Sequence, residues 1–216
     1  GDKSIEPRDN LIRIYPQKNL FSHIIGQIDN DNNGISGLEK SLDEKLKNIR
    51  KPVKLTVDKD IQFLIRDELE QFNKVFSTKG SAAILMNVRN GEILSLVSLP
   101  DFDPNKREKI SDKNLINRAT KGVYEFGSVF KTFTLAAAFH ENVIEPKTEF
   151  VDLPKSLTCA GFPIREYDNK IPSTLTAEQI LVRSGNIGSV KIGQEVGEKK
   201  LKIFLTKLGL LEKIDF

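Results

Sequence analysis

The pattern that most constrains the fold is an apolar hairpin near the middle of the chain. The segment AAILMNV (Ala82–Val88) is followed by Arg89-Asn90-Gly91 and then by EILSLVS (Glu92–Ser98). Asn-Gly tolerates the positive φ that a tight turn between antiparallel strands requires. The two prolines of the next stretch, SLPDFDPN, must leave the sheet. These residues therefore predict a pair of antiparallel strands.

A strand and a long helix are predicted before this hairpin. After Pro52, VKLTV (Val53–Val57) alternates between apolar and polar residues like a strand. Asp58 or Asp60 can then cap a long helix. The apolar residues that recur at helical spacing, and so mark its buried face, are Ile61, Leu64, Ile65, Leu69, Phe72 and Phe76.

Shorter helices are predicted elsewhere. They are expected at 38–46, 128–141 and 187–196, and at 201–208, where Gly209 stops the last one. Thr176 and Gln179 form a capping-box pattern before another apolar run. This order of elements favours a mixed α/β (α+β) domain, in which helices pack on an antiparallel sheet.

Composition excludes several classes of function. The 216 residues contain 33 Lys and Arg and 30 Asp and Glu, and the basic residues are mixed with acids rather than clustered, so no nucleic-acid partner is expected. The longest apolar runs are shorter than the about 20 residues that a membrane span needs. A single Cys159 excludes an internal disulfide. His23 and His140 are far apart in the sequence, so no metal site is expected. No residue pattern calls for an organic cofactor either.

A serine and a lysine stand three positions apart at the start of a predicted helix, in YEFGSVFKTF (Tyr124–Phe133). Positions i and i+3 are neighbours on a helix, so Lys131 can reach Ser128. The unpaired N–H groups of a first helical turn favour a negatively charged oxygen, and a desolvated lysine of lowered pKa could accept the serine proton. A serine at this place is also a common helix cap. The pair alone leaves both interpretations open.

A second short motif follows downstream. RSGNIGSVKI (Arg183–Ile192) places Ser184 and Asn186 in an S-x-N arrangement, 56 residues after Ser128. The motifs S-x-x-K, S-D-N and K-T-G together are typical of class A β-lactamases and penicillin-binding proteins. The order and spacing of the first two, with Gly127 before the serine, favour serine acyl-transfer chemistry.

Taken together, five stretches in this order resemble the class B penicillin-binding proteins, and within them the division-specific septal transpeptidases. The stretches are RIYPQKNLFSHIIGQIDNDNNGISGLEKSLDEKL, VKLTVDKDIQFLIRDELEQF, GSAAILMNVRNGEILSLVSLPDFDPN, NRATKGVYEFGSVFKTFTLAAAF and RSGNIGSVKI. The resemblance implies a penicillin-binding protein transpeptidase, or serine β-lactamase-like, fold. Residues 1–50 would form the end of the non-catalytic pedestal domain and a linker, and residues 51–216 the N-terminal part of the transpeptidase domain.

The resemblance also implies a role for each motif residue. Ser128 would attack the carbonyl of the penultimate D-alanine in a peptidoglycan stem peptide that ends in D-Ala-D-Ala, and Lys131 would take its proton. Ser184 would relay a proton to the departing D-alanine. Asn186 would orient the substrate amide and Lys131. The acyl-enzyme would then pass to an amine of a neighbouring stem, and β-lactams would acylate the same serine because they mimic the D-Ala-D-Ala end.

Partners and location follow from the same resemblance. A membrane glycan polymerase and other septal division proteins are the implied partners. The implied location is the cytoplasmic (inner) membrane, reached through a single N-terminal anchor absent from this chain, with the catalytic domain in the periplasm. Gly1 is expected to be a tag remnant. The K-[ST]-G motif is missing, so we expect a piece that ends before it and that has little or no turnover by itself.

Two alternatives remain open at this stage. A class A-type β-lactamase would need a glutamate with a positioned water for deacylation. Glu198 is the nearest imitation, but it lies only 14 residues after Ser184, and Lys202 replaces the expected asparagine. A scaffold protein that keeps the fold without the chemistry would account for the missing third motif if 216 residues were the natural length.

Overall fold

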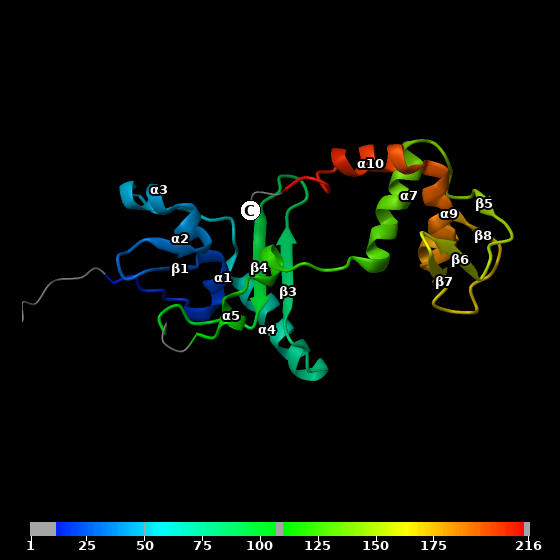
Figure 1. Cartoon of the computed structure of the whole chain (residues 1–216). Helices are drawn as coiled ribbons and strands as arrows, with labels where there is room; N and C mark the ends of the chain where they lie inside the picture. The colour runs from blue at the N-terminus through cyan, green and yellow to red at the C-terminus, as the bar shows by residue number, and fades with distance from the viewer. Residues whose placement is uncertain (1–11, 50, 107–109, 214–216) are drawn as a thin grey trace, which may run out of the picture. The chain divides into compact units, whose positions relative to one another are not determined.

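The chain forms two compact units, residues 1–123 and 124–216. The computed structural model describes residues 12–49, 51–106 and 110–213 (Figure 1). The domain boundary expected near residue 50 falls within the first unit and stays a prediction. Within the described ranges, no helix is both long enough and apolar enough to span a membrane.

The hairpin is the centre of the first unit. Strands β3 (Ser81–Met86) and β4 (Ile93–Leu99) pair antiparallel and lie side by side in Figure 1. Gly91 has a φ of +76°, and its N–H donates to the carbonyl of Asn87 at 2.8 Å, which closes the turn. β4 ends immediately before Pro100. The predicted hairpin and its exit are confirmed.

Helix α4 (Lys59–Phe76) packs against β4 and begins at the expected cap. The Asp58 carboxylate accepts hydrogen bonds from the N–H groups of Asp60 and Ile61, at 2.9 and 3.0 Å. The predicted buried face is wrong in part. Leu64, Phe72 and Phe76 are between 48% and 64% exposed, whereas Gln62 is the buried residue of the helix, at 2%.

Residues 53–57 do not form the predicted strand, and the chain from Thr56 to Gln62 meets β4 through isolated hydrogen bonds instead of a ladder. Thr56 donates its hydroxyl to the carbonyl of Ile93 at 2.7 Å, and the N–H of Asp58 donates to the carbonyl of Leu94 at 2.9 Å. Gln62 binds both backbone groups of Leu96, at 2.8 and 3.0 Å. Isolated bonds of this kind therefore occupy backbone groups of β4 that a neighbouring strand would need.

Short elements complete the first unit. They are η1 (Lys18–Phe21), α1 (Ser22–Ile25), β1 (Gln27–Ile28), β2 (Gly34–Ser36), α2 (Gly37–Ser41), α3 (Asp43–Asn48), α5 (Asp112–Leu115) and α6 (Arg118–Lys121). The single helix predicted at 38–46 is thus two helices, because Leu42 leaves helical geometry at φ −112°. Arg13 binds the buried Glu39 through two bonds of 2.8 Å and ties the N-terminal segment to α2.

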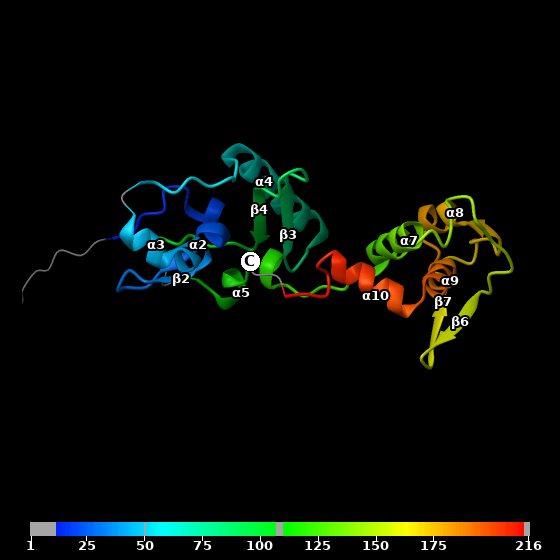
Figure 2. The ribbon, with the colours of Figure 1, turned by 90° about the horizontal axis from the view of Figure 1, so that it is seen from above.

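The second unit is mainly helical. Its elements are η3 (Gly127–Phe130), α7 (Lys131–His140), β5 (Glu149–Phe150), β6 (Ser156–Cys159), β7 (Phe162–Arg165), β8 (Leu175–Thr176), α8 (Ala177–Val182), α9 (Asn186–Val196) and α10 (Glu198–Lys207). Helices α7 and α9 pack side by side (Figures 1 and 2). The predicted Thr176–Gln179 capping box is present at the start of α8.

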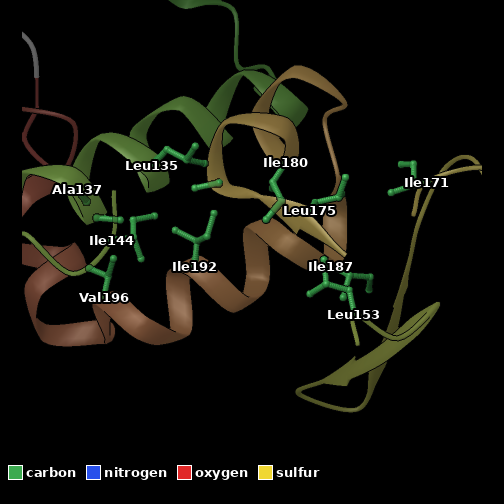
Figure 3. Close-up of a cluster of buried hydrophobic side chains, with 12 residues drawn as sticks. Leu135, Ala137, Ile144, Leu153, Ile171, Leu175, Ile180, Ile187, Ile192 and Val196 are labelled. Atoms are coloured by element: carbon green, nitrogen blue, oxygen red, sulfur yellow. The ribbon is translucent and has the colours of Figure 1, made fainter. Parts of the chain in front are cut away.

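One apolar cluster holds these helices together (Figure 3). Its buried members are Leu135, Ala137, Ala138, Ile144, Leu153, Ile171, Leu175, Ala177, Ile180, Ile187, Ile192 and Val196. Gly188 of α9 allows a close approach between two helices within this cluster. A Cβ at this position would lie 2.6 Å from two carbons of Ile180, so only glycine lets α9 pack this tightly on α8.

Candidate active site

Ser128 lies in η3, the single 3-10 turn that leads into α7. The preceding Gly127 has a φ of +54°, a left-handed conformation that glycine adopts without a Cβ penalty. Ser128 itself is exposed. The helix predicted at 128–141 therefore begins with a tighter turn, which presents the serine to solvent one turn before Lys131.

Lys131 is the first residue of α7, and its amine meets the turn between α8 and α9. The Nζ atom lies 2.6 Å from the carbonyl oxygen of Ser184, 2.5 Å from Oδ1 of Asn186 and 3.1 Å from Oγ of Ser184. Three of the four residues singled out by sequence are thus in direct contact: Lys131 meets Ser184 and Asn186, which lie 53 and 55 positions further along the chain. The fourth, Ser128, lies in the preceding turn, three residues before Lys131, and among the described residues it forms no hydrogen bond with Lys131.

The backbone of Ser184 has an unusual conformation. Its N–H donates to the carbonyl of Leu181, and the N–H of Gly185 donates to that of Ile180, each at 2.9 Å. This is a Schellman ending of α8, in which the left-handed position is usually glycine. Ser184 occupies that position with a φ of +51°. Ser184 keeps a side chain at this position at a cost in backbone strain. Its side-chain hydroxyl and its backbone carbonyl both reach Lys131.

The bonds of Lys131 are compatible with a neutral amine. Two of its three partners are carbonyl-type oxygens, which can only accept hydrogen bonds, whereas the third is a hydroxyl, which can donate or accept. A neutral amine can satisfy both acceptors with its two N–H groups and keep its lone pair for a hydroxyl proton. Burial lowers the pKa of Lys131 below its ordinary value, and the negative charge of Glu166 partly opposes this. The arrangement can therefore supply a general base.

Glu166 is a residue of this site that sequence reasoning missed. Its carboxylate accepts hydrogen bonds from the N–H groups of Asn186 and Ile187, at 2.7 and 3.0 Å. The neighbouring carbonyl of Arg165 accepts from Nδ2 of Asn186 at 2.7 Å, which turns Oδ1 of Asn186 toward Lys131. A local signal exists in hindsight: α9 begins after Gly185, which has no side chain to cap a helix.

The alternative deacylating base lies far from these residues. Glu198 is in the first turn of α10, beyond the whole of α9, and an 11-residue helix is roughly 16 Å long. Lys131 and Asn186 are at the other end of α9. Glu198 therefore does not take part in this site. Among the described residues, no group of three or more metal-binding side chains comes together.

A mixed fold that packs an S-x-x-K helix against an S-x-N turn carries two of the three motifs typical of class A β-lactamases and penicillin-binding proteins. The chain belongs to the penicillin-binding protein transpeptidase family: the penicillin binding protein transpeptidase domain matches residues 81–216. This match and the relatives that follow confirm the resemblance to class B penicillin-binding proteins and the expected fold class.

Individual relatives agree with this assignment. The chain is 32% identical to the probable peptidoglycan D,D-transpeptidase FtsI of Caulobacter vibrioides, over 92% of the chain and 34% of the relative. It is 29% identical to stage V sporulation protein D of Bacillus subtilis, over 98% and 37%. A crystal structure of penicillin binding protein 3 from Mycobacterium tuberculosis, complexed with aztreonam, matches with a TM-score of 0.81 and 27% identity, over 92% of this chain and 46% of that one. The chain thus spans about a third of the length of these curated relatives.

Proposed function

We propose that the protein is a peptidoglycan D,D-transpeptidase that works through an acyl-enzyme on Ser128. The observation that carries this proposal is the Lys131 amine, held within 3.1 Å of both Ser184 and Asn186 and one turn from an exposed serine. A base beside a serine hydroxyl can remove its proton and so activate the serine oxygen as a nucleophile. The relatives named as D,D-transpeptidases support the same reaction.

The reaction has two balanced halves. In the first, the Ser128 oxygen bonds to the penultimate D-alanine carbonyl while its proton passes to Lys131. The bond to the terminal D-alanine then breaks, and Ser184 delivers the proton to the departing amine. In the second half, an amine of a neighbouring stem attacks the ester carbon and gives up a proton to Lys131, the ester bond breaks, and Lys131 passes that proton to the departing Ser128 oxygen. The N–H of Ser128 contributes to the oxyanion site.

Its place in the cell is part of the proposal. Septal cell-wall synthesis is supported by the relative named FtsI, and recognition of β-lactams by the aztreonam complex of another relative. We propose that the catalytic domain works in the periplasm, tethered to the cytoplasmic membrane, with a glycan polymerase and other septal proteins as partners. The K-[ST]-G motif is not in this sequence, so we propose that the 216-residue chain alone turns over little substrate.

Acylation by a β-lactam tests the proposed function directly. The full product of the encoding gene and the 216-residue chain are each incubated with penicillin, and intact mass and the modified peptide are measured. We expect one persistent adduct on Ser128 in the full product, slower labelling of the 216-residue chain, and none in a Ser128→Ala variant. Ser156→Ala, another exposed serine, is the matched control and should label normally.

Two results would contradict the proposal. If the full product gains no adduct, the scaffold interpretation is favoured. If the adduct forms and is rapidly released as hydrolysed penicillin, the protein is a β-lactamase instead.

A further inference from the structure

The turn that carries Ser184 and Asn186 is held from one side by the three residues that end and follow β7. Glu166 binds the N–H groups of Asn186 and Ile187, and the carbonyl of Arg165 binds the side chain of Asn186. The Tyr167 hydroxyl donates to the carbonyl of Arg183, at the other end of the turn, at 3.2 Å. The turn is therefore bracketed at both ends by residues 165–167.

Glu166 makes the strongest hydrogen bonds that residues 165–167 form to this turn. The first N–H groups of a helix have no partner within the helix, and Gly185 offers no side chain to satisfy them. The carboxylate of Glu166 accepts from two of them and places a negative charge at the positive end of α9. Such charge-assisted bonds are the stronger class of hydrogen bond, so they fix the start of α9 at a defined position.

The position of α9 matters because Asn186, its first residue, is bonded to Lys131. We propose that Glu166 is a positioning residue, which holds the Ser184–Asn186 turn in the geometry that the Lys131 amine requires. This inference rests on the proposed function, since it assigns Glu166 a part in the acylation of Ser128. It extends the site beyond the S-x-x-K and S-x-N motifs to a residue that no motif identifies.

The charge of Glu166 gives the proposal a readout that a purely structural role would not move. The negative charge of Glu166 acts on Lys131, and Ser184 and Asn186 face the amine with neutral groups. A negative charge favours the protonated amine. Removing this charge lowers the pKa of Lys131. The acid limb of the pH profile, where the acylation rate falls as the Lys131 amine becomes protonated, therefore moves to lower pH.

The test measures the rate of labelling by a fluorescent penicillin between pH 5 and pH 10 in the full product of the gene. For Glu166→Gln we expect the rate at the plateau to fall by at least about tenfold, because a small misplacement of reacting groups costs this much or more. We also expect its acid limb to shift to lower pH. Glu166→Asp keeps the charge, so it should retain the wild-type limb with an intermediate rate.

Glu178→Gln is the matched control, since Glu178 is an exposed acid in the first turn of the neighbouring α8. It should label at the wild-type rate. If Glu166→Gln keeps the wild-type rate and limb, the proposal is wrong. A lower rate with an unmoved limb and a matching loss of thermal stability also overturns it, because Glu166 would then serve only the fold. Labelling of the wild-type protein is read in the same experiment, so failure of the proposed function itself would be seen separately.

Discussion

At the scale of single residues, Ser184 illustrates how the site is constructed. A non-glycine residue in the left-handed region costs about 1–2 kcal/mol, and the Schellman position that Ser184 occupies is one where glycine would be free of that cost. The same conformation brings its carbonyl and hydroxyl to Lys131. The strain and the contact come from one backbone geometry, as is common at functional sites.

Substitution of Ser184 should separate stability from chemistry. We expect Ser184→Gly to have a free energy of unfolding about 1 kcal/mol higher than that of Ser184→Ala, because glycine relieves the backbone strain. Both variants lack the hydroxyl and should acylate roughly 10²-fold more slowly or worse, the usual effect of losing an acid–base group. Thermal unfolding and penicillin labelling measure the two effects. Equal stability of the two variants would mean that the φ of +51° carries no strain.

At the scale of elements, the packing of α9 on α8 depends on Gly188. We expect Gly188→Ala to lower the free energy of unfolding by about 1–3 kcal/mol, because its Cβ would overlap Ile180 in a filled core. Gly193→Ala on the same helix is the matched control: its nearest neighbour, in Thr134, is at 3.5 Å, so this change should be neutral or slightly stabilising.

A double-mutant cycle checks the cause. Ile180→Val removes one of the overlapping carbons and should recover part of the stability lost in Gly188→Ala. If the two effects simply add, contact between Gly188 and Ile180 is not the reason for the loss.

One buried amide links α4 to β4 through hydrogen bonds. Gln62 binds the backbone of Leu96, accepts from the hydroxyl of Ser95 and donates to the carbonyl of Leu20. We expect Gln62→Met to cost about 3 kcal/mol, because buried groups lose their partners at about 1–3 kcal/mol each. Hydrogen exchange of the Leu96 amide should become faster. Gln71→Met, at an exposed position of the same helix, should change stability by less than about 0.5 kcal/mol; a similar loss there would contradict the assignment.

The elements also explain which features the sequence could predict. The hairpin, the Asp58 cap and the capping box depend on neighbouring residues, so local patterns were sufficient to identify them. The failed strand at 53–57 and the burial of Gln62 depend on β4, more than 30 residues away. Glu166 was missed for the same reason: it is an ordinary acid in the sequence, and only the fold brings it to the start of α9.

At the scale of the whole molecule, the four residues assigned to the reaction belong to one unit. The cluster that supports them takes its buried members only from Leu135 to Val196. We therefore expect a polypeptide of residues 124–216 to retain helical circular dichroism and to unfold cooperatively on heating. Ile192→Ala should lower its stability by about 2–5 kcal/mol, as for other large-to-small changes in a core. Gradual, non-cooperative melting of the wild-type piece would contradict this expectation.

The lowered pKa of Lys131 has a consequence for covalent ligands. Ordinary lysines are protonated at neutral pH and react poorly with electrophiles, whereas Lys131 has a larger neutral fraction and is only half-buried. An amine-directed warhead, carried by a molecule that fits beside Ser128, would block the proposed base and leave the proposed nucleophile untouched. Because such a compound needs no β-lactam ring, enzymes that hydrolyse that ring would not inactivate it.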